Sequence, residues 1–127
     1  MSAVIVTGAG AGIGEEIALA AARDGHTVGV LDIDGAAAES VASAIPTGIP
    51  LEAAVNDEAQ VVAAFDRFES EAGTVADMVV NNAGIVRFGS LAELPVEDWR
   101  LTLVVNLTGT FIVSRVAAVR MGRAGGG

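Results

Sequence analysis

Cysteine, tyrosine and lysine are all missing from this sequence of 127 residues. The absence of cysteine excludes a disulfide framework and any thiolate metal site, and it favours a reducing compartment. We therefore predict no metal site and a cytoplasmic location. All seven basic residues are arginine, so chemistry that requires a tyrosine or lysine side chain has no source in this sequence.

Positive charge is scarce as well. Sixteen acidic residues outnumber the seven arginines and give a net charge of −9. Such a surface repels polyanions, so nucleic-acid binding is not expected.

The opening MSAVIV lacks the basic flank and the length of a signal peptide, so no export is expected. The most apolar stretch, 101–119, includes Asn106, Thr108 and Arg115, which favours a soluble helix over a membrane span.

Apolar residues are abundant, at 52% against 18% charged, and this balance is typical of a folded globular protein. The length fits one domain, 1–127. Hydrophobic periodicity, Gly25, Gly73 and the Pro46–Gly48 break predict strands alternating with helices. The strands are expected at 3–7, 26–32, 49–55 and 76–84, and the helices at 13–25, 35–45, 58–73 and 96–120.

This alternation predicts an α/β fold with a Rossmann-like, doubly wound parallel sheet and helices on both faces. If the topological switch point lies beside the first strand, the strand order is 3-2-1-4. Ligands of such sheets bind at the carboxyl ends of the strands. The candidate site is therefore expected beyond the first and fourth strands.

Four glycines crowd the turn TGAGAGIG, residues 7–14, directly after the first strand. Gly8, Gly12 and Gly14 have the spacing GxxxGxG. A strand that turns sharply into a helix directs the unpaired N–H groups of that helix at one point, where a diphosphate binds well. A tight, alanine-rich connection without a ligand is the alternative.

Asp32 lies at the end of the second strand, 18 residues after Gly14. An acid at about this offset binds the ribose hydroxyls of a dinucleotide. The alternative for Asp32 is a helix N-cap, although Asp34 is equally available. No arginine between Arg23 and Arg67 offers itself to a 2′-phosphate, so the expected cofactor is NAD, as NAD(H), rather than NADP.

Three motifs together resemble the short-chain dehydrogenase/reductase family of the classical type. They are TGAGAGIG with Asp32, NNAG at 81–84 and VNLTG at 105–109, in the family's order and spacing. The resemblance implies an NAD-dependent oxidoreductase that interconverts alcohols and ketones. It assigns the cofactor to Gly8, Gly12, Ile13, Gly14, Asp32, Ile33, Val55, Asn82, Ala83 and Gly84, and it makes Asn106 a member of the catalytic group.

The sequence departs from the family in several places. Ala54 replaces an aspartate that usually contacts the adenine amino group. The catalytic tyrosine and lysine have no counterpart, because both residue types are missing. The resemblance covers about the first half of the family's domain, and GRAGGG at 122–127 resembles the loop before a fifth strand. We therefore expect a nucleotide-binding half domain, truncated after the fourth helix and with little activity alone.

Other interpretations stay open at this stage. Asn106 could simply bond a neighbouring carbonyl in its helix. The chain could be a non-catalytic nucleotide-binding or assembly module that needs a second chain, and a methyltransferase-like protein is a weaker alternative.

The helix 96–120 is apolar nearly all round and, by the resemblance, packs across a subunit interface. Together with the open edge of the fourth strand, this predicts a homo-oligomer. Trp99 is expected to be a packing residue.

Overall fold

The computed structural model describes residues 2–127. Every predicted strand and helix is present, with adjusted ends. In chain order the elements are β1 Ala3–Thr7, α1 Gly12–Arg23, β2 Thr27–Asp32, α2 Gly35–Ser43, β3 Gly48–Glu52, α3 Glu58–Ala72, β4 Met78–Val80, α4 Val96–Leu103, the π-helical segment η1 Val104–Thr108 and α5 Gly109–Ala124.

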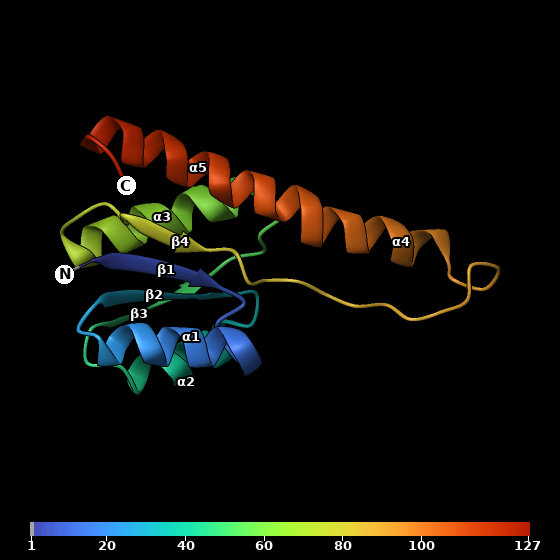
Figure 1. Ribbon diagram of the computed structural model, residues 1–127, viewed down its shortest axis with the longest axis horizontal. Helices are drawn as coiled ribbons and strands as arrows, with labels where there is room; N and C mark the ends of the chain where they lie inside the picture. The colour runs from blue at the N-terminus through green and yellow to red at the C-terminus, as the bar shows by residue number, and fades with distance from the viewer. Residues whose placement is uncertain (1) are drawn as a thin grey trace.

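The four strands form one parallel sheet in the order β3-β2-β1-β4, which confirms the predicted topology. β1 pairs with β2 along its full length and with β4 over three residues, from Val4 opposite Met78 to Val6 opposite Val80. Because the strands are parallel, their carboxyl ends lie along one edge of the sheet (Figure 1). The loops after them converge there.

Two helical layers cover the sheet, and the alternation of side chains along β1 shows why both faces need cover. Ala3 and Ile5 point into a core with α3 and α5, whereas Val4 and Val6 point into a core with α1 and α2. Figure 1 shows α1 and α2 on one side of the sheet and α3 and α5 on the other. A strand buried on both faces must be apolar throughout, as AVIVT is up to Thr7.

Local capping chemistry sets the ends of the best-defined helix, α3. Asp57 is its N-cap, and the Asp57 side chain accepts a hydrogen bond from the Gln60 amide. Gly73 ends it in the left-handed conformation with φ of 70°, which glycine adopts without steric cost. Val61, Phe65 and Phe68 recur at helical spacing and are all buried. These features agree with the sequence pattern.

The last predicted helix begins at Val96 as expected but ends later than predicted. It is continuous over Val96–Ala124, so Gly122, Arg123 and Ala124 are helical and the predicted loop is limited to the final glycines. The helix ends where Gly125 takes φ of 98°.

The fourth strand is shorter than predicted, Met78–Val80, because the chain bends into the Asn81–Gly84 turn and β4 pairs only with β1.

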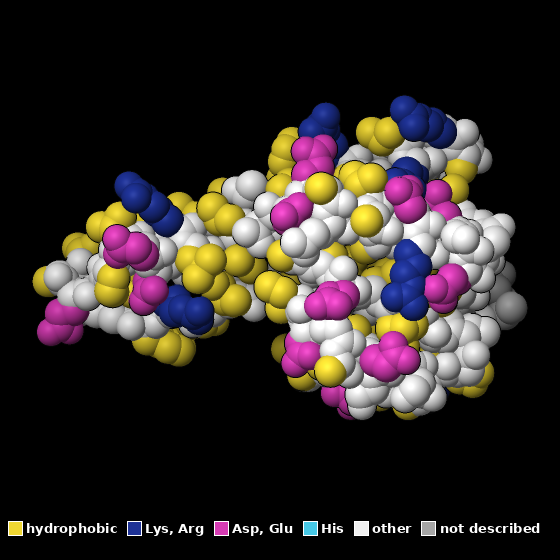
Figure 2. Space-filling view, turned by 180° about the vertical axis from the view of Figure 1, so that it is seen from behind, with side chains coloured by type: hydrophobic (Ala, Val, Ile, Leu, Met, Phe, Trp, Pro, Cys, Tyr) yellow, Lys and Arg dark blue, Asp and Glu magenta, His cyan; other side chains and the backbone are white. Residues whose placement is uncertain are grey.

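Residues 85–108 extend away from the sheet, and we call this segment the arm. It comprises a loop, α4 and η1, and none of its residues is buried. Trp99 is 57% exposed, so the expectation that it packs within the domain is wrong for this chain. Figure 2 shows hydrophobic side chains spread over the narrow projection that the arm forms.

The helix Val96–Ala124 is long and apolar enough to cross a membrane by length and composition, with a hydropathy of 1.6 over its most apolar window. Core helices of soluble proteins meet the same criterion. Polar side chains along this helix bond to the rest of the domain: Asn106 to Ile85, Ser114 to Asn81 and Arg120 to Asp66.

Candidate functional site

The glycine turn has the conformation that its sequence predicts. Gly8 and Gly12 have φ of 63° and 60°, values that residues with a Cβ rarely adopt. A Cβ at Gly14 would collide with the Gly8 carbonyl oxygen, so the start of α1 can pack against the turn only through glycine. At Gly12 no atom lies within 4 Å of the position that a Cβ would take, which leaves the turn open to an approaching ligand.

Asp32 belongs to this turn rather than to the following helix. Its Oδ2 accepts a hydrogen bond from the Gly10 amide at 2.9 Å, and its Oδ1 accepts one from the Asp34 amide at 2.9 Å. Asp34 is the N-cap of α2 and accepts from the Ala37 amide. The helix-cap alternative for Asp32 is therefore wrong. The Asp32 carboxylate instead lies beside the glycine turn.

The Asn81–Gly84 turn is fastened to the end of β1 by Thr7. The Thr7 hydroxyl oxygen accepts hydrogen bonds from the amides of Asn82 and Ala83, at 3.1 and 3.0 Å. The Asn82 side chain donates to the carbonyl oxygens of Thr7 and Gly8. Two loops that are far apart in sequence are thereby held as one unit at the sheet edge.

Sequence reasoning assigned no role to Thr7. It is 1% exposed and is the only buried polar residue in the part of the chain that the structure describes. A buried hydroxyl must find partners, because an unpaired polar group costs free energy. The sequence signal that could have identified Thr7 is a polar residue at the end of an apolar strand, directly before the glycines.

A cavity of about 410 Å³ lies where these loops meet. Residues from the ends of all four strands reach it. Among the predicted site residues, Gly8, Ile13, Asp32, Ile33, Val55, Asn82, Ala83 and Gly84 line it, while Gly12 and Gly14 shape the turn without lining it. The lining residues that the sequence did not single out are Ala11, Leu31, Ala53, Asn56, Ile85 and Val105.

Asn106 lies on η1, behind the wall of the cavity. Its Oδ1 accepts from the Ile85 amide at 2.8 Å, and its Nδ2 donates to the Ile85 carbonyl at 2.9 Å. The side-chain amide therefore holds the loop that follows Gly84. The π-helical segment around Asn106 was not predicted, because widening one helical turn leaves no mark in hydrophobic periodicity. Such segments occur often near functional sites.

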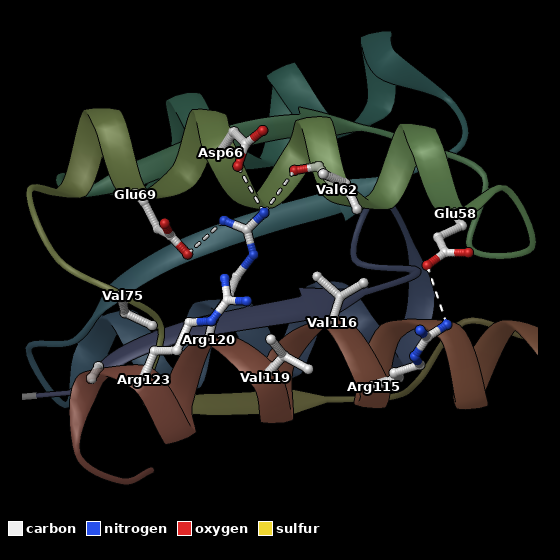
Figure 3. Close-up of a pocket in the computed structure, with 11 residues that line it drawn as sticks. Glu58, Val62, Asp66, Glu69, Val75, Arg115, Val116, Val119, Arg120 and Arg123 are labelled. Atoms are coloured by element: carbon white, nitrogen blue, oxygen red, sulfur yellow. Dashed lines mark hydrogen bonds and ion pairs between the residues drawn. The ribbon is translucent and has the colours of Figure 1, made fainter.

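A larger cavity, about 550 Å³, lies between α3 and α5 on the outer face. Figure 3 shows that ion pairs between the two helices cross it. Arg120 binds Asp66 at 2.7 Å and Glu69 at 2.8 Å, and Arg115 pairs with Glu58 at 3.4 Å. Both arginines are thereby paired with carboxylates of α3. The cavity also lies away from the strand ends, so we assign it no ligand.

The same ion pairs affect the acidity of Arg120. Burial alone would lower the pKa of the Arg120 guanidinium, but hydrogen bonds to Glu69 and Asp66, together with their negative charges, raise that pKa above its ordinary value. The guanidinium also lies 5.7 Å from the centre of the Phe65 ring. Arg120 is therefore a permanently charged residue that joins α5 to α3.

Residues 2–127 contain no group of three or more His, Asp or Glu side chains placed to hold a metal ion.

Comparison with known proteins agrees with this geometry. The family model described as short chain dehydrogenase matches residues 2–127. D-threitol dehydrogenase from Mycolicibacterium smegmatis is 38% identical over 97% of this chain and 48% of that protein. The structure of a short-chain type dehydrogenase/reductase from Mycobacterium marinum matches with a TM-score of 0.92 and 32% identity, over 98% of this chain and 51% of the other.

A third match carries a nucleotide. The structure of 3-ketoacyl-(acyl-carrier-protein) reductase from Brucella melitensis complexed with NADH has a TM-score of 0.92 and 32% identity, and this chain covers 52% of it. The chain spans about half the length of the curated relatives it matches. With the sheet order, the glycine turn and the family match in agreement, the chain belongs to the short-chain dehydrogenase family.

Proposed function

We propose that the 410 Å³ cavity binds NAD(H). The observation that carries the proposal is the convergence of the glycine turn and Asp32 at one edge of the sheet. The turn would receive the diphosphate on backbone amides near the start of α1, where the helix dipole favours negative charge. The second strand ends in a carboxylate that would accept hydrogen bonds from the ribose hydroxyls.

The residues present fit such a group. Gly14 leaves no room for a Cβ, and a Cβ at Gly10 would lie 2.8 Å from Asp32 Oδ2. The backbone therefore packs the start of α1 against the turn, and approaches the Asp32 carboxylate, more closely than residues with a Cβ permit. NAD is favoured over NADP, because the Asp32 carboxylate would repel a 2′-phosphate. A cytoplasmic location is part of the same proposal.

The reaction that we propose for the complete site is the interconversion of an alcohol and a ketone, with the nicotinamide supplying or receiving the hydride. This chain would bind the dinucleotide and orient it. Asn106 would be its contribution to the catalytic group, through the loop that it holds at Ile85. The family resemblance requires a tyrosine and a lysine for proton transfer, and the sequence has neither. We therefore propose that the chain alone turns over little or no substrate.

NADH titration followed by nicotinamide fluorescence tests the binding. Saturable enhancement that is competed by NAD⁺ is the expected result. No binding at millimolar NADH would contradict the proposal. Incubation of the pure chain with NAD⁺ and a panel of secondary alcohols tests the catalytic statement, and turnover well above the buffer rate would contradict it.

A non-catalytic nucleotide-binding or assembly module is the second candidate, and the exposed apolar surface of the arm favours it. Phe88 is 91% exposed and Leu91 is fully exposed, and β4 pairs on one side only. We propose that the chain forms a homo-oligomer through the helix 96–120 and the β4 edge. Light scattering at micromolar concentration is expected to show a dimer or a larger species, and a monodisperse monomer would contradict this.

A further inference from the structure

The chain directly after β4 forms one wall of the 410 Å³ cavity. The lining residues in this wall are Asn82, Ala83, Gly84 and Ile85. They belong to no helix or strand, so no ladder of backbone hydrogen bonds fixes the course of the wall. Side chains of neighbouring elements have to position it. Thr7 does so from the end of β1, where its hydroxyl oxygen accepts from the amides of Asn82 and Ala83.

The long helix Val96–Ala124 holds both ends of this wall. At the far end, the Asn106 side chain accepts from the Ile85 amide at 2.8 Å and donates to the Ile85 carbonyl at 2.9 Å. At the near end, Asn81 Nδ2 donates to the Ser114 hydroxyl oxygen at 3.0 Å. The two supports are about 12 Å apart along the helix, and the wall between them extends to at most about 14 Å. A nearly extended wall therefore fits between the supports, and Figure 1 shows the chain after β4 running alongside the helix.

Ser114 is a fixed support because the helix that carries it is fixed. Val113, Val116 and Ala117 of α5 are buried in the core beneath it, and Arg120 joins α5 to α3 through two ion pairs. The sheet holds β4 from one side, since within residues 2–127 β4 pairs only with β1. The Ser114 hydroxyl adds a support from the helical layer at the point where the strand ends.

Resting on the proposed NAD(H) binding, we propose that Ser114 is a positioning residue of the nucleotide cavity. Ser114 does not line the cavity, so it acts through Asn81 on the wall that follows. Each backbone residue that becomes ordered on binding costs free energy, so a wall that is fixed in advance favours binding. Without the Ser114 hydroxyl, the near end of the wall is free to move. The dinucleotide then has to order it.

Dissociation constants for NADH, measured by nicotinamide fluorescence, test this role. Ser114→Ala, Asn81→Ala and the double variant form a cycle that isolates the contribution of the bond between the two side chains. Ser114→Thr keeps a hydroxyl at the same position. Ser43→Ala is the matched control, because the Ser43 hydroxyl bonds a carbonyl oxygen within α2 at 2.7 Å and does not line the cavity. Thermal unfolding by circular dichroism verifies that each variant is folded.

Ser114→Ala and Asn81→Ala are each expected to weaken NADH binding roughly three- to tenfold, and the double variant is expected to lose no more than either. Ser114→Thr and Ser43→Ala are expected to bind NADH as the unaltered chain does.

A folded Ser114→Ala with unchanged NADH affinity would overturn the inference and leave NAD(H) binding intact. The same conclusion follows if the two losses multiply in the double variant, if Ser114→Thr binds as weakly as Ser114→Ala, or if Ser43→Ala loses as much. Should Ser114→Ala not fold, Asn81→Ala decides by the same criterion. Failure of the unaltered chain to bind NADH would overturn both proposals.

Discussion

Two regions of this molecule have a similar share of apolar residues but differ in how far they bury them. In the body, formed by the sheet with α1, α2, α3 and α5, Phe68 is completely buried. In the arm, residues 85–108, Phe88 is 91% exposed and no residue is buried. The body has a sheet whose two faces give each helix a surface to cover, whereas the arm has none. Apolar composition thus predicts burial only where the topology supplies an opposing layer.

The largest expected difference between the regions comes from removing one phenylalanine side chain from each. Phe68→Ala is expected to lower the free energy of unfolding by about 3–5 kcal/mol, because it empties a buried site in the core. Phe88→Ala is expected to change it by less than about 0.5 kcal/mol. Urea unfolding at low protein concentration measures both. A cost above about 1 kcal/mol for Phe88→Ala would mean that the arm packs against protein in solution.

The second prediction tests the ligand-binding edge of the body. Asp32→Ala is expected to weaken NADH binding by roughly 10- to 100-fold, since hydrogen bonds from the ribose to a charged group are lost. Discrimination against NADPH should shrink at the same time, because the repelling carboxylate is gone. Parallel titrations with NADH and NADPH measure both effects. Unchanged NADH affinity in a folded Asp32→Ala protein would contradict the assignment.

Alanine substitutions at two glycines separate an effect on ligand binding from an effect of backbone strain on stability. Gly12 and Gly73 have φ of 60° and 70°, and neither has an atom within 4 Å of a Cβ added to it. Alanine at either position is expected to cost roughly 1–2 kcal/mol of stability. Only Gly12→Ala should also weaken NADH binding, because Gly12 belongs to the turn proposed to receive the diphosphate, whereas Gly73 is the C-cap of α3. Equal effects of the two variants on NADH affinity would show that the turn does not touch the diphosphate.

The smallest expected effect concerns the arginines of the long helix. Arg120 joins α5 to α3 through Asp66, Glu69 and the Phe65 ring, with 17% of its side chain exposed. Arg120→Ala is expected to cost roughly 1 kcal/mol, whereas Arg100→Ala in the arm should be nearly neutral. The raised pKa of Arg120 keeps the guanidinium charged at any pH short of strong alkali. Its contribution should therefore be constant between pH 5 and 9 in denaturant titrations.

Local sequence signals predicted most of the body correctly. The alternation of apolar segments gave the strands and helices, and the Asp57 and Gly73 caps gave the ends of α3. The glycines and Asp32 predicted which residues would meet at the sheet edge. These successes share a cause, because capping, turn conformation and periodicity depend on residues within a few positions of one another.

Local sequence signals could not predict the interactions between distant segments. Thr7 meets Asn82 across 75 residues, and Asn106 meets Ile85 across 21. Asn56 looked like an ordinary loop residue until the structure placed it on the lining of the cavity at the sheet edge. The widened turn of η1 and the exposure of Trp99 depend on what packs nearby, which periodicity does not report.

The sequence by itself determined the strands and helices of the body, their parallel arrangement and the chemical character of the glycine turn, because each follows from short-range sterics and from the handedness of strand crossovers. Only the tertiary structure decided which polar groups share one cavity, which side chains hold its loops and which apolar residues stay exposed. Those outcomes depend on three-dimensional neighbours, and hydrogen bonds and burial exist only once the layers have come together.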